Sequence, residues 1–213
     1  MDAAPGSEEA KKIVEQGYDR VAHEYARLEG EVEWPRMKWL RMLLKTIPPG
    51  ASVLDLGCGS GDPADIEIAK EHTVTGVDVS QTQVDLARKN VPDGTFIRAD
   101  AGSVEFPPDS FDAVVSFYTL EHIPRKEHPG ILRRINRWLK RDGHLLISIE
   151  AADYDDEFGE WLGVPMFLSC YDPETMKRLV AEAGFALIRS EIETQIENGN
   201  EIPFLWIYGR KTE

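Results

Sequence analysis

The sequence predicts a single α/β domain, a three-layer sandwich on a seven-stranded, mostly parallel sheet with one antiparallel strand and an N-terminal helical lid. Short apolar segments alternate with helical segments from residue 50 to residue 150, which is typical of parallel strands joined by right-handed crossovers. A glycine-rich turn follows the first of these strands, and residues 172–213 are predicted as a helix and two strands. A chain of 213 residues is long enough for one well-buried domain.

Residues 1–47 are expected to form a helical cap over the sheet. Ser7 is a suitable helix cap, because its hydroxyl can accept from free N–H groups of a first turn that also carries acidic residues. Apolar residues then recur at three- and four-residue spacing along one helix face, namely Ile13, Val14, Tyr18, Val21, Ala22, Tyr25 and Leu28. A second helix is predicted over residues 33–46 and ends at a Pro-Pro-Gly turn.

Residues 50–150 are expected to form the ligand-binding core, with strands at 53–56, 73–77, 95–99, 111–117 and 144–149. Gly57, Gly59 and Gly61 follow the first strand, and glycine lets the backbone approach a ligand where a Cβ would clash. The helix expected from Pro63 would present free N–H groups to an anionic group. Asp78 follows the second strand at the spacing where an acid accepts ribose hydroxyls. Together these features predict a nucleotide-type ligand.

The alternating pattern breaks after residue 150. Residues 151–171 are rich in acids and aromatics and show no regular pattern, and connections of this length are commonly lids or binding loops. We therefore expect a substrate-lid insert here. Asp172 is a suitable cap for a helix that ends at Gly184, and two strands separated by a polar turn follow as an antiparallel hairpin.

The composition of the chain limits the classes of partner that it can bind. The formal net charge of −14 argues against nucleic-acid binding, because such a surface repels phosphate backbones. Two widely spaced cysteines indicate a reducing compartment, and no apolar run approaches a membrane span, so a cytoplasmic protein without membrane contact is expected. The five histidines show no ligand spacing, and no metal site is predicted, although acids from separate strand ends could still converge on Mg²⁺. The sequence does not indicate an oligomeric state.

The stretch from Val53 to Asp62 resembles motif I of the class I S-adenosylmethionine-dependent methyltransferases. A dinucleotide fingerprint would require a third glycine where Asp62 stands. The resemblance implies a Rossmann-like fold and S-adenosylmethionine as cofactor. In that family the Tyr18 equivalent commonly faces the cofactor, and the Asp100-Ala101 pair resembles its adenine contact. The expected cofactor-binding residues are Tyr18, Asp55, Gly57, Cys58, Gly59, Gly61, Asp78, Val79, Asp100, Ala101 and Phe117.

The resemblance implies an SN2 methyl transfer to a small-molecule acceptor with an oxygen, nitrogen or carbon nucleophile. Because the donor is already activated, the protein chiefly has to align the reactants. Tyr18 and Phe117 are candidates to stabilise the sulfonium through their aromatic faces. His122 is the first candidate for a general base, with Glu121 and Tyr18 as further catalytic candidates, and a purely structural role for His122 is the alternative.

Three other functions remain open at this point. They are an NAD-dependent oxidoreductase, which the residue at Asp62 disfavours, a non-catalytic S-adenosylmethionine-binding protein, and a protein methyltransferase. The acidic residues of the 151–171 insert could attract a cationic acceptor such as an amine, or could simply be a solvated loop.

Overall fold

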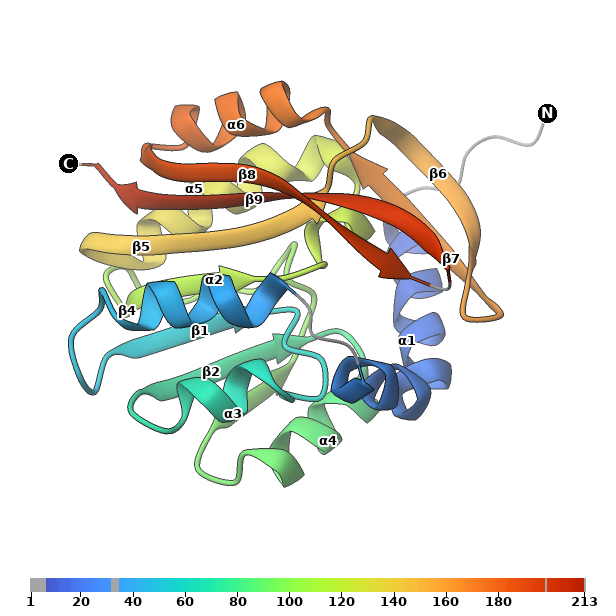
Figure 1. Cartoon of the computed structure of the whole chain (residues 1–213), viewed down its shortest axis with the longest axis horizontal. Coiled ribbons are helices and arrows are strands. Elements are labelled where there is room, and N and C mark those ends of the chain that lie inside the picture. Colours follow the sequence, from blue (N-terminus) through green and yellow to red (C-terminus); the bar gives the residue numbers. More distant parts are fainter. Residues whose placement is uncertain (1–6, 32–34, 198, 213) are drawn as a thin grey trace.

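A seven-stranded sheet forms the centre of the computed structural model, which describes residues 7–31, 35–197 and 199–212 (Figure 1). Its strands are β1 Ser52–Leu56, β2 Thr73–Asp78, β3 Thr95–Arg98, β4 Phe111–Ser116, β5 Leu139–Glu150, β8 Phe185–Glu197 and β9 Asn200–Lys211. They lie in the order β3-β2-β1-β4-β5-β9-β8. β9 is antiparallel to both of its neighbours, and the other pairs are parallel. The predicted sheet with one antiparallel strand is confirmed.

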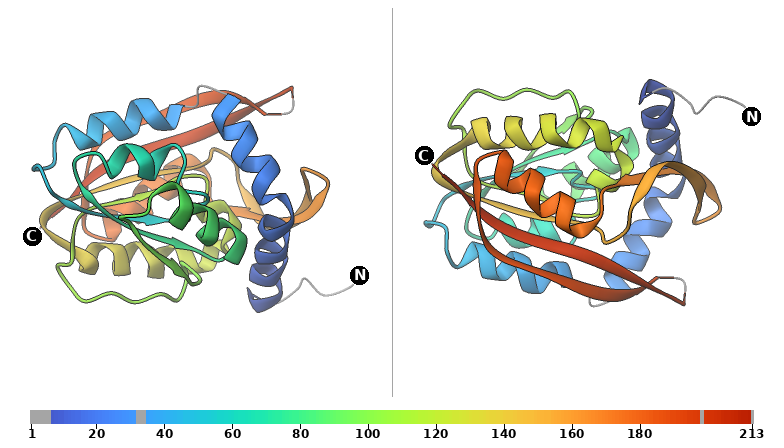
Figure 2. Two further views of the ribbon diagram at one scale, coloured as in Figure 1. Left: turned by 90° about the horizontal axis from the view of Figure 1, so that it is seen from below. Right: turned by 90° about the horizontal axis from the view of Figure 1, so that it is seen from above.

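Helices cover both faces of this sheet (Figure 2). The helices are α2 Pro35–Leu44, α3 Ala64–Ile68, α4 Gln81–Asn90, α5 His128–Trp138 and α6 Pro173–Glu182. α2, α3 and α4 pack on one face, where Trp39 of α2 stacks on Trp206 of β9 with ring centroids 5.6 Å apart. α5 and α6 pack on the other face, against the alternate side chains of the same strands. This is the predicted three-layer sandwich.

The long helix α1 (Ser7–Glu31) lies across the carboxyl edge of the sheet, as Figure 1 shows. Val14 and Val21 are buried against Val164, Met166 and Phe167 of a two-stranded antiparallel hairpin. The hairpin consists of β6 (Tyr154–Trp161) and β7 (Val164–Cys170). α1 therefore covers the edge at which the strand ends converge.

The expectation of an irregular insert at residues 151–171 is wrong, because most of this segment is the hairpin β6–β7. Leu162 and Gly163, with φ of 49° and 75°, form the two-residue loop, a geometry that matches the twist of the flanking strands. β6 is mostly exposed, which accounts for its acidic residues, whereas β7 buries its apolar residues against α1. Instead of an irregular loop, this segment forms two paired strands, of which β7 packs on α1.

Smaller differences concern element ends. β5 starts at Leu139 rather than at residue 144, and α3 is a single short turn of helix from Ala64 to Ile68. α5 begins at His128, directly after a short 3-10 turn over Arg125–Glu127. The predicted start of the second helix at residues 33–34 lies outside the described residues, and α2 is described from Pro35.

Candidate cofactor cleft and active site

A cleft opens where the segments following β1, β2, β3 and β4 meet α1. It encloses about 740 Å³, part of which is open to solvent. Most of the predicted site residues line it, namely Tyr18, Gly57, Cys58, Gly59, Asp78, Val79, Asp100, Ala101, Phe117 and His122. Asp55 and Gly61 are not among the lining residues, and Glu121 lines a neighbouring cavity.

The glycine turn after β1 bends tightly over the end of β2. The N–H groups of Gly57 and Cys58 both donate to the carbonyl of Val77, at 2.7 and 3.0 Å. Gly57 has φ of 80°, and a Cβ there would lie 2.7 Å from the Cβ of Thr119. Only glycine fits this position, both for its backbone conformation and for the approach of the segment after β4. The turn leaves its remaining backbone facing the cleft.

Asp78 connects the turn to the end of β2. One of its carboxylate oxygens accepts from the N–H of Gly59 and the other from the N–H of Ser80, each at 2.9 Å. A carboxylate has about four acceptor sites, and Asp78 is among the residues that line the cleft. Asp78 therefore holds the turn in place and presents an acceptor to the cleft.

Two buried acids lie beneath the turn rather than in the cleft wall. Asp55 is 2% exposed and Asp65, from α3, is fully buried. Burial, followed by the charge of Asp55 and a hydrogen bond to it, raises the pKa of Asp65 well above its ordinary value, while Arg36 opposes the rise. Asp65 therefore holds its proton more readily than an exposed aspartate, next to Asp55. The predicted acid of the motif shapes the turn without lining the cleft.

Arg36 is a cleft residue that the sequence did not reveal. Its side chain is only 6% exposed, lines the cleft and lies over the ring of Tyr118, 5.8 Å from the ring centroid. A buried guanidinium beside a cleft is a suitable partner for a carboxylate. The signal in the sequence was weak, because Arg36 stands in the first turn of α2 among other basic residues.

Asp100 carries an ion pair at the β3 side of the cleft. Lys11 of α1 lies 2.9 Å from Asp100 and 2.7 Å from Glu127, and the hydroxyl of Ser7 donates to Glu127 at 2.8 Å. The N–H of Gly102 donates to the second oxygen of Asp100 at 2.7 Å. The start of α1 is thereby held against the cleft, and Lys11 becomes one of its lining residues.

His122 and Tyr18 meet between α1 and the segment after β4. Nδ1 of His122 lies 2.9 Å from the carbonyl oxygen of Phe167, which can only accept, so Nδ1 carries the proton. Nε2 is then the acceptor for the Tyr18 hydroxyl, also at 2.9 Å. Burial lowers the pKa of His122 to about 4, and the bond to Phe167 only partly opposes this shift. The imidazole is therefore neutral at physiological pH, and its acceptor nitrogen is occupied by Tyr18.

The lowered pKa of His122 predicts that the protein loses stability in acid. His122 is protonated near pH 6.5 in the unfolded chain and near pH 4 in the folded chain. Its contribution to the free energy of unfolding is therefore fully present above pH 6.5 and is lost as the pH falls from 6.5 to 4. The contribution is roughly 2 kcal/mol between pH 7 and pH 5. Urea unfolding at these two pH values measures the loss. His122→Gln should lose less stability between pH 7 and pH 5 than the wild type does. The control His23→Gln, at an exposed histidine, should lose as much as the wild type. Equal losses in all three proteins would refute the assignment.

A second cavity of about 890 Å³ adjoins the cleft. It lies between α1, the hairpin β6–β7 and the ends of β5 and β9. Tyr18, Tyr25, Tyr118 and His122 line both spaces, so the two cavities meet at these side chains. Glu121 lines the second cavity and is 3% exposed.

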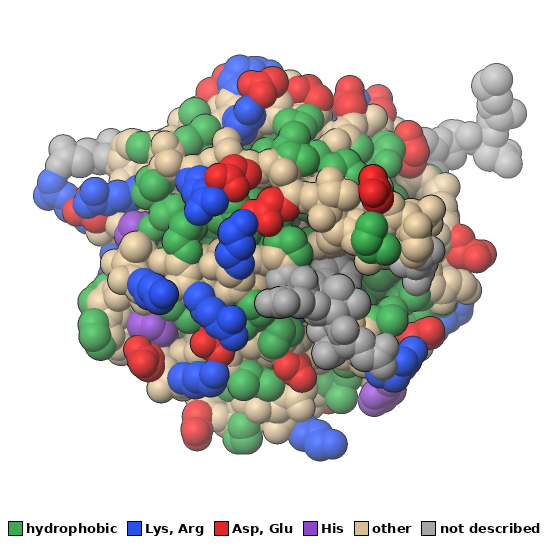
Figure 3. Space-filling view, in the orientation of Figure 1, with side chains coloured by type: hydrophobic (Ala, Val, Ile, Leu, Met, Phe, Trp, Pro, Cys, Tyr) green, Lys and Arg blue, Asp and Glu red, His purple; other side chains and the backbone are tan. Residues whose placement is uncertain are grey.

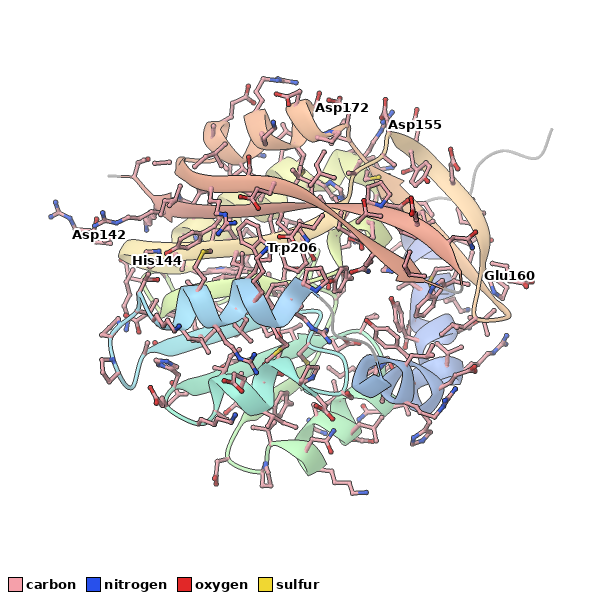
Figure 4. All side chains as sticks on the ribbon, in the orientation of Figure 1. Asp142, His144, Asp155, Glu160, Asp172 and Trp206 are labelled. Atoms are coloured by element: carbon pink, nitrogen blue, oxygen red, sulfur yellow. The ribbon has the colours of Figure 1, made fainter. Side chains whose placement is uncertain are left out.

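Other site classes find no support among the described residues. Within the described ranges, no group of three or more histidine, cysteine, aspartate or glutamate side chains is arranged to hold a metal ion. No described helix combines the length and apolar character that a membrane crossing needs. Figure 3 shows acidic and basic side chains interspersed over one face, and Figure 4 places Asp142 and His144 at the end of the sheet away from the hairpin.

Comparison with known proteins points to one family. A family model described as a methyltransferase domain matches residues 25–190. A demethylmenaquinone methyltransferase of Thermotoga maritima is 32% identical over 145 residues, which are 64% of this chain and 61% of that protein. The chain covers 61–63% of the length of the first curated relatives that it matches.

Solved structures share the fold over nearly the whole chain. The 1,6-didemethyltoxoflavin-N1-methyltransferase of Burkholderia thailandensis, with bound 1,6-didemethyltoxoflavin and S-adenosylhomocysteine, is 20% identical with a TM-score of 0.76, and covers 100% of this chain and 94% of its own. The [4+2]-cyclase SpnF is also 20% identical, with a TM-score of 0.72 and coverage of 98% and 97%. At this identity the likeness shows the fold alone. The matched family model, however, spans most of the chain, and the protein belongs to the class I S-adenosylmethionine-dependent methyltransferases.

Proposed function

We propose that this protein transfers a methyl group from S-adenosylmethionine to a small-molecule acceptor. The observation that carries the proposal is the junction of two cavities, the cleft at the strand ends and the cavity under the hairpin, which share Tyr18, Tyr25, Tyr118 and His122. A donor in the first cavity and an acceptor in the second would meet there.

The residues that line the cleft fit the cofactor. Gly57 and Gly59 line the cleft, and no atom lies within 4 Å of a Cβ built at Gly59. Asp78 stands at the end of β2, where an acid can accept ribose hydroxyls. Asp100 lies at the β3 side as the proposed partner of the adenine amine, and Arg36 is a suitable partner for the carboxylate of the methionine part. When bound, S-adenosylmethionine supplies a sulfonium methyl group that a nucleophile can displace.

The chain's own contribution to the reaction is mainly alignment. Alignment of reactants can account for roughly 7–11 kcal/mol of a barrier. The T-shaped contacts of Tyr18 with Tyr25 and His122, with centroids 5.9 and 5.3 Å apart, fix its ring at the junction. Phe117 is buried at the end of β4 and lines the cleft. Both rings are proposed to face the positively charged donor.

We assign His122 a positioning role rather than that of the general base. Its lowered pKa makes it a weak base, and its acceptor nitrogen is already bonded to the Tyr18 hydroxyl. Its bonds to Tyr18 and Phe167 join α1 to the hairpin and hold both over the junction. Glu121 remains the candidate base where the acceptor arrives protonated.

Two observations favour a small-molecule acceptor over a protein substrate. The second cavity is formed between α1 and the hairpin rather than along an open groove. The relatives named above act, by their names, on demethylmenaquinone and on 1,6-didemethyltoxoflavin. We propose that the hairpin β6–β7 serves as the substrate lid.

S-adenosylhomocysteine should raise the melting temperature of the full chain. At 100 times its dissociation constant, a ligand that binds only the folded state adds about 2.7 kcal/mol, which corresponds to roughly 5–10 °C for a domain of this size. Differential scanning calorimetry with and without the ligand measures the shift, with NAD as the comparison ligand. A shift produced by NAD, with none from S-adenosylhomocysteine, would contradict the proposed function.

A further inference from the structure

The cavity under the hairpin combines acidic and aromatic side chains. Building on the proposed methyl transfer, we propose that its acceptor is a cationic amine, held between aromatic rings and the carboxylates of Glu121 and Glu150. The chemical class that fits is an ammonium group on an apolar body.

The charges of the cavity have one sign. Three glutamates line it, and no lysine or arginine is among the described residues that do so. Their exposure is graded, since Glu160 is exposed at the turn end of the hairpin (Figure 4), Glu150 is half-buried, and Glu121 is buried. The only histidine that lines it among these residues is His122, which is neutral. An anionic acceptor would therefore meet only like charges on entering.

The titration of neighbouring groups agrees with a negative cavity. Burial raises the pKa of the Cys170 thiol to about 12, and the charges of Glu121 and Glu150 add to the rise. Burial, the charge of Glu150 and the hydrogen bond that the Tyr154 hydroxyl donates to that carboxylate at 3.0 Å likewise raise the pKa of Tyr154 to about 12. Both carboxylates thus act on groups around the cavity, and a cation placed there would be attracted by both.

The apolar walls suit the rest of such a molecule. Tyr25 and Trp161 pack edge to face with centroids 5.2 Å apart, and Tyr118 and Phe204 do so at 4.8 Å. All four rings belong to residues that line the cavity. Aromatic faces attract ammonium groups through the ring quadrupole. A neutral acceptor would use these walls but would leave the glutamates without a role in recognition.

The amine must lose one proton before its nitrogen lone pair can react. An ammonium group that passes a proton to the carboxylate of Glu121 leaves a neutral amine and a carboxylic acid, so atoms and charge balance and no further reactant is needed. Glu121 precedes His122, one of the side chains at the junction of the two cavities. The same carboxylate can therefore attract the cation and accept its proton.

Three probes of similar size distinguish a cationic, a neutral and an anionic acceptor. They are phenethylamine, 2-phenylethanol and 3-phenylpropanoate. Each is titrated calorimetrically at pH 7 into the full chain saturated with S-adenosylhomocysteine. We expect the amine to bind at least about tenfold more tightly than the alcohol, and the carboxylate not to bind measurably. Equal binding of amine and alcohol, binding of the carboxylate, or no binding of any probe would overturn the inference.

Two charge-neutralising variants test whether Glu150 causes the preference for the amine. Glu150→Gln should weaken phenethylamine about tenfold or more and leave 2-phenylethanol unchanged. Glu157→Gln changes an exposed residue of the same hairpin outside the cavity lining and should leave both affinities at their wild-type values. Loss of amine preference in Glu157→Gln but not in Glu150→Gln would contradict the assignment. The melting-temperature shift with S-adenosylhomocysteine separates the two proposals. Absence of that shift removes methyl transfer, whereas a shift without amine preference removes only the acceptor class.

Discussion

Gly57→Ala is expected to destabilise the protein by about 2–5 kcal/mol and to abolish binding of S-adenosylhomocysteine. The left-handed conformation at φ of 80° costs a residue with a Cβ about 1–2 kcal/mol. The new Cβ would also lie 2.7 Å from the Cβ of Thr119, and forced overpacking typically costs about 1–3 kcal/mol more. The segment after β4 would have to retreat from the cleft. Urea unfolding and calorimetric titration measure the two effects.

Gly50→Ala is the matched control for this prediction. Gly50 has nearly the same backbone conformation, with φ of 72°, but no atom lies within 4 Å of a Cβ built there. It does not line the cleft. The control variant should therefore show the conformational cost alone and bind S-adenosylhomocysteine as the wild type does. If both variants were equally stable and bound equally well, the close approach of Thr119 to the turn would be refuted.

Asp78→Ala is expected to weaken S-adenosylhomocysteine binding by roughly 10²–10⁴-fold while the protein stays folded. Each hydrogen bond from a ribose hydroxyl to a charged acceptor is worth about 1.5–3 kcal/mol, and the N–H of Gly59 also loses its partner. Calorimetric titration gives the affinity, and far-ultraviolet circular dichroism reports the fold. Asp93→Ala removes the same charge from an exposed turn and should bind normally. Wild-type affinity in Asp78→Ala would remove this carboxylate from the site.

The fold and the cleft were predictable because their signals are local. The glycine turn, and Asp78 at a fixed distance beyond it, follow strands whose apolar pattern indicates burial, and parallel topology brings such strand ends together. Asp55 shows the limit of the motif. It was expected to contact the cofactor, but it is buried next to Asp65 and does not line the cleft. A motif thus gives residue types and spacing, but not which side of the backbone faces the ligand.

The acceptor side could not be predicted because it depends on contacts between distant segments. Tyr18 and His122 are far apart in the chain and meet only because α1 crosses the sheet edge. The hairpin β6–β7 was missed because β6 is largely exposed and its alternation is weak, whereas β7 finds its apolar partners on α1. Arg36 and Lys11 likewise reach the cleft from helices that precede the core. None of these placements follows from a local pattern.

The central claim is that this chain moves a methyl group from S-adenosylmethionine to a small molecule. Its most direct test is incubation of the full chain with methyl-labelled S-adenosylmethionine and a panel of small acceptors, amines included, followed by mass analysis. The account predicts S-adenosylhomocysteine in amounts equal to a singly methylated small-molecule product, and no turnover without acceptor. Label recovered on protein, or cofactor binding with no methylated product from any acceptor, would contradict it.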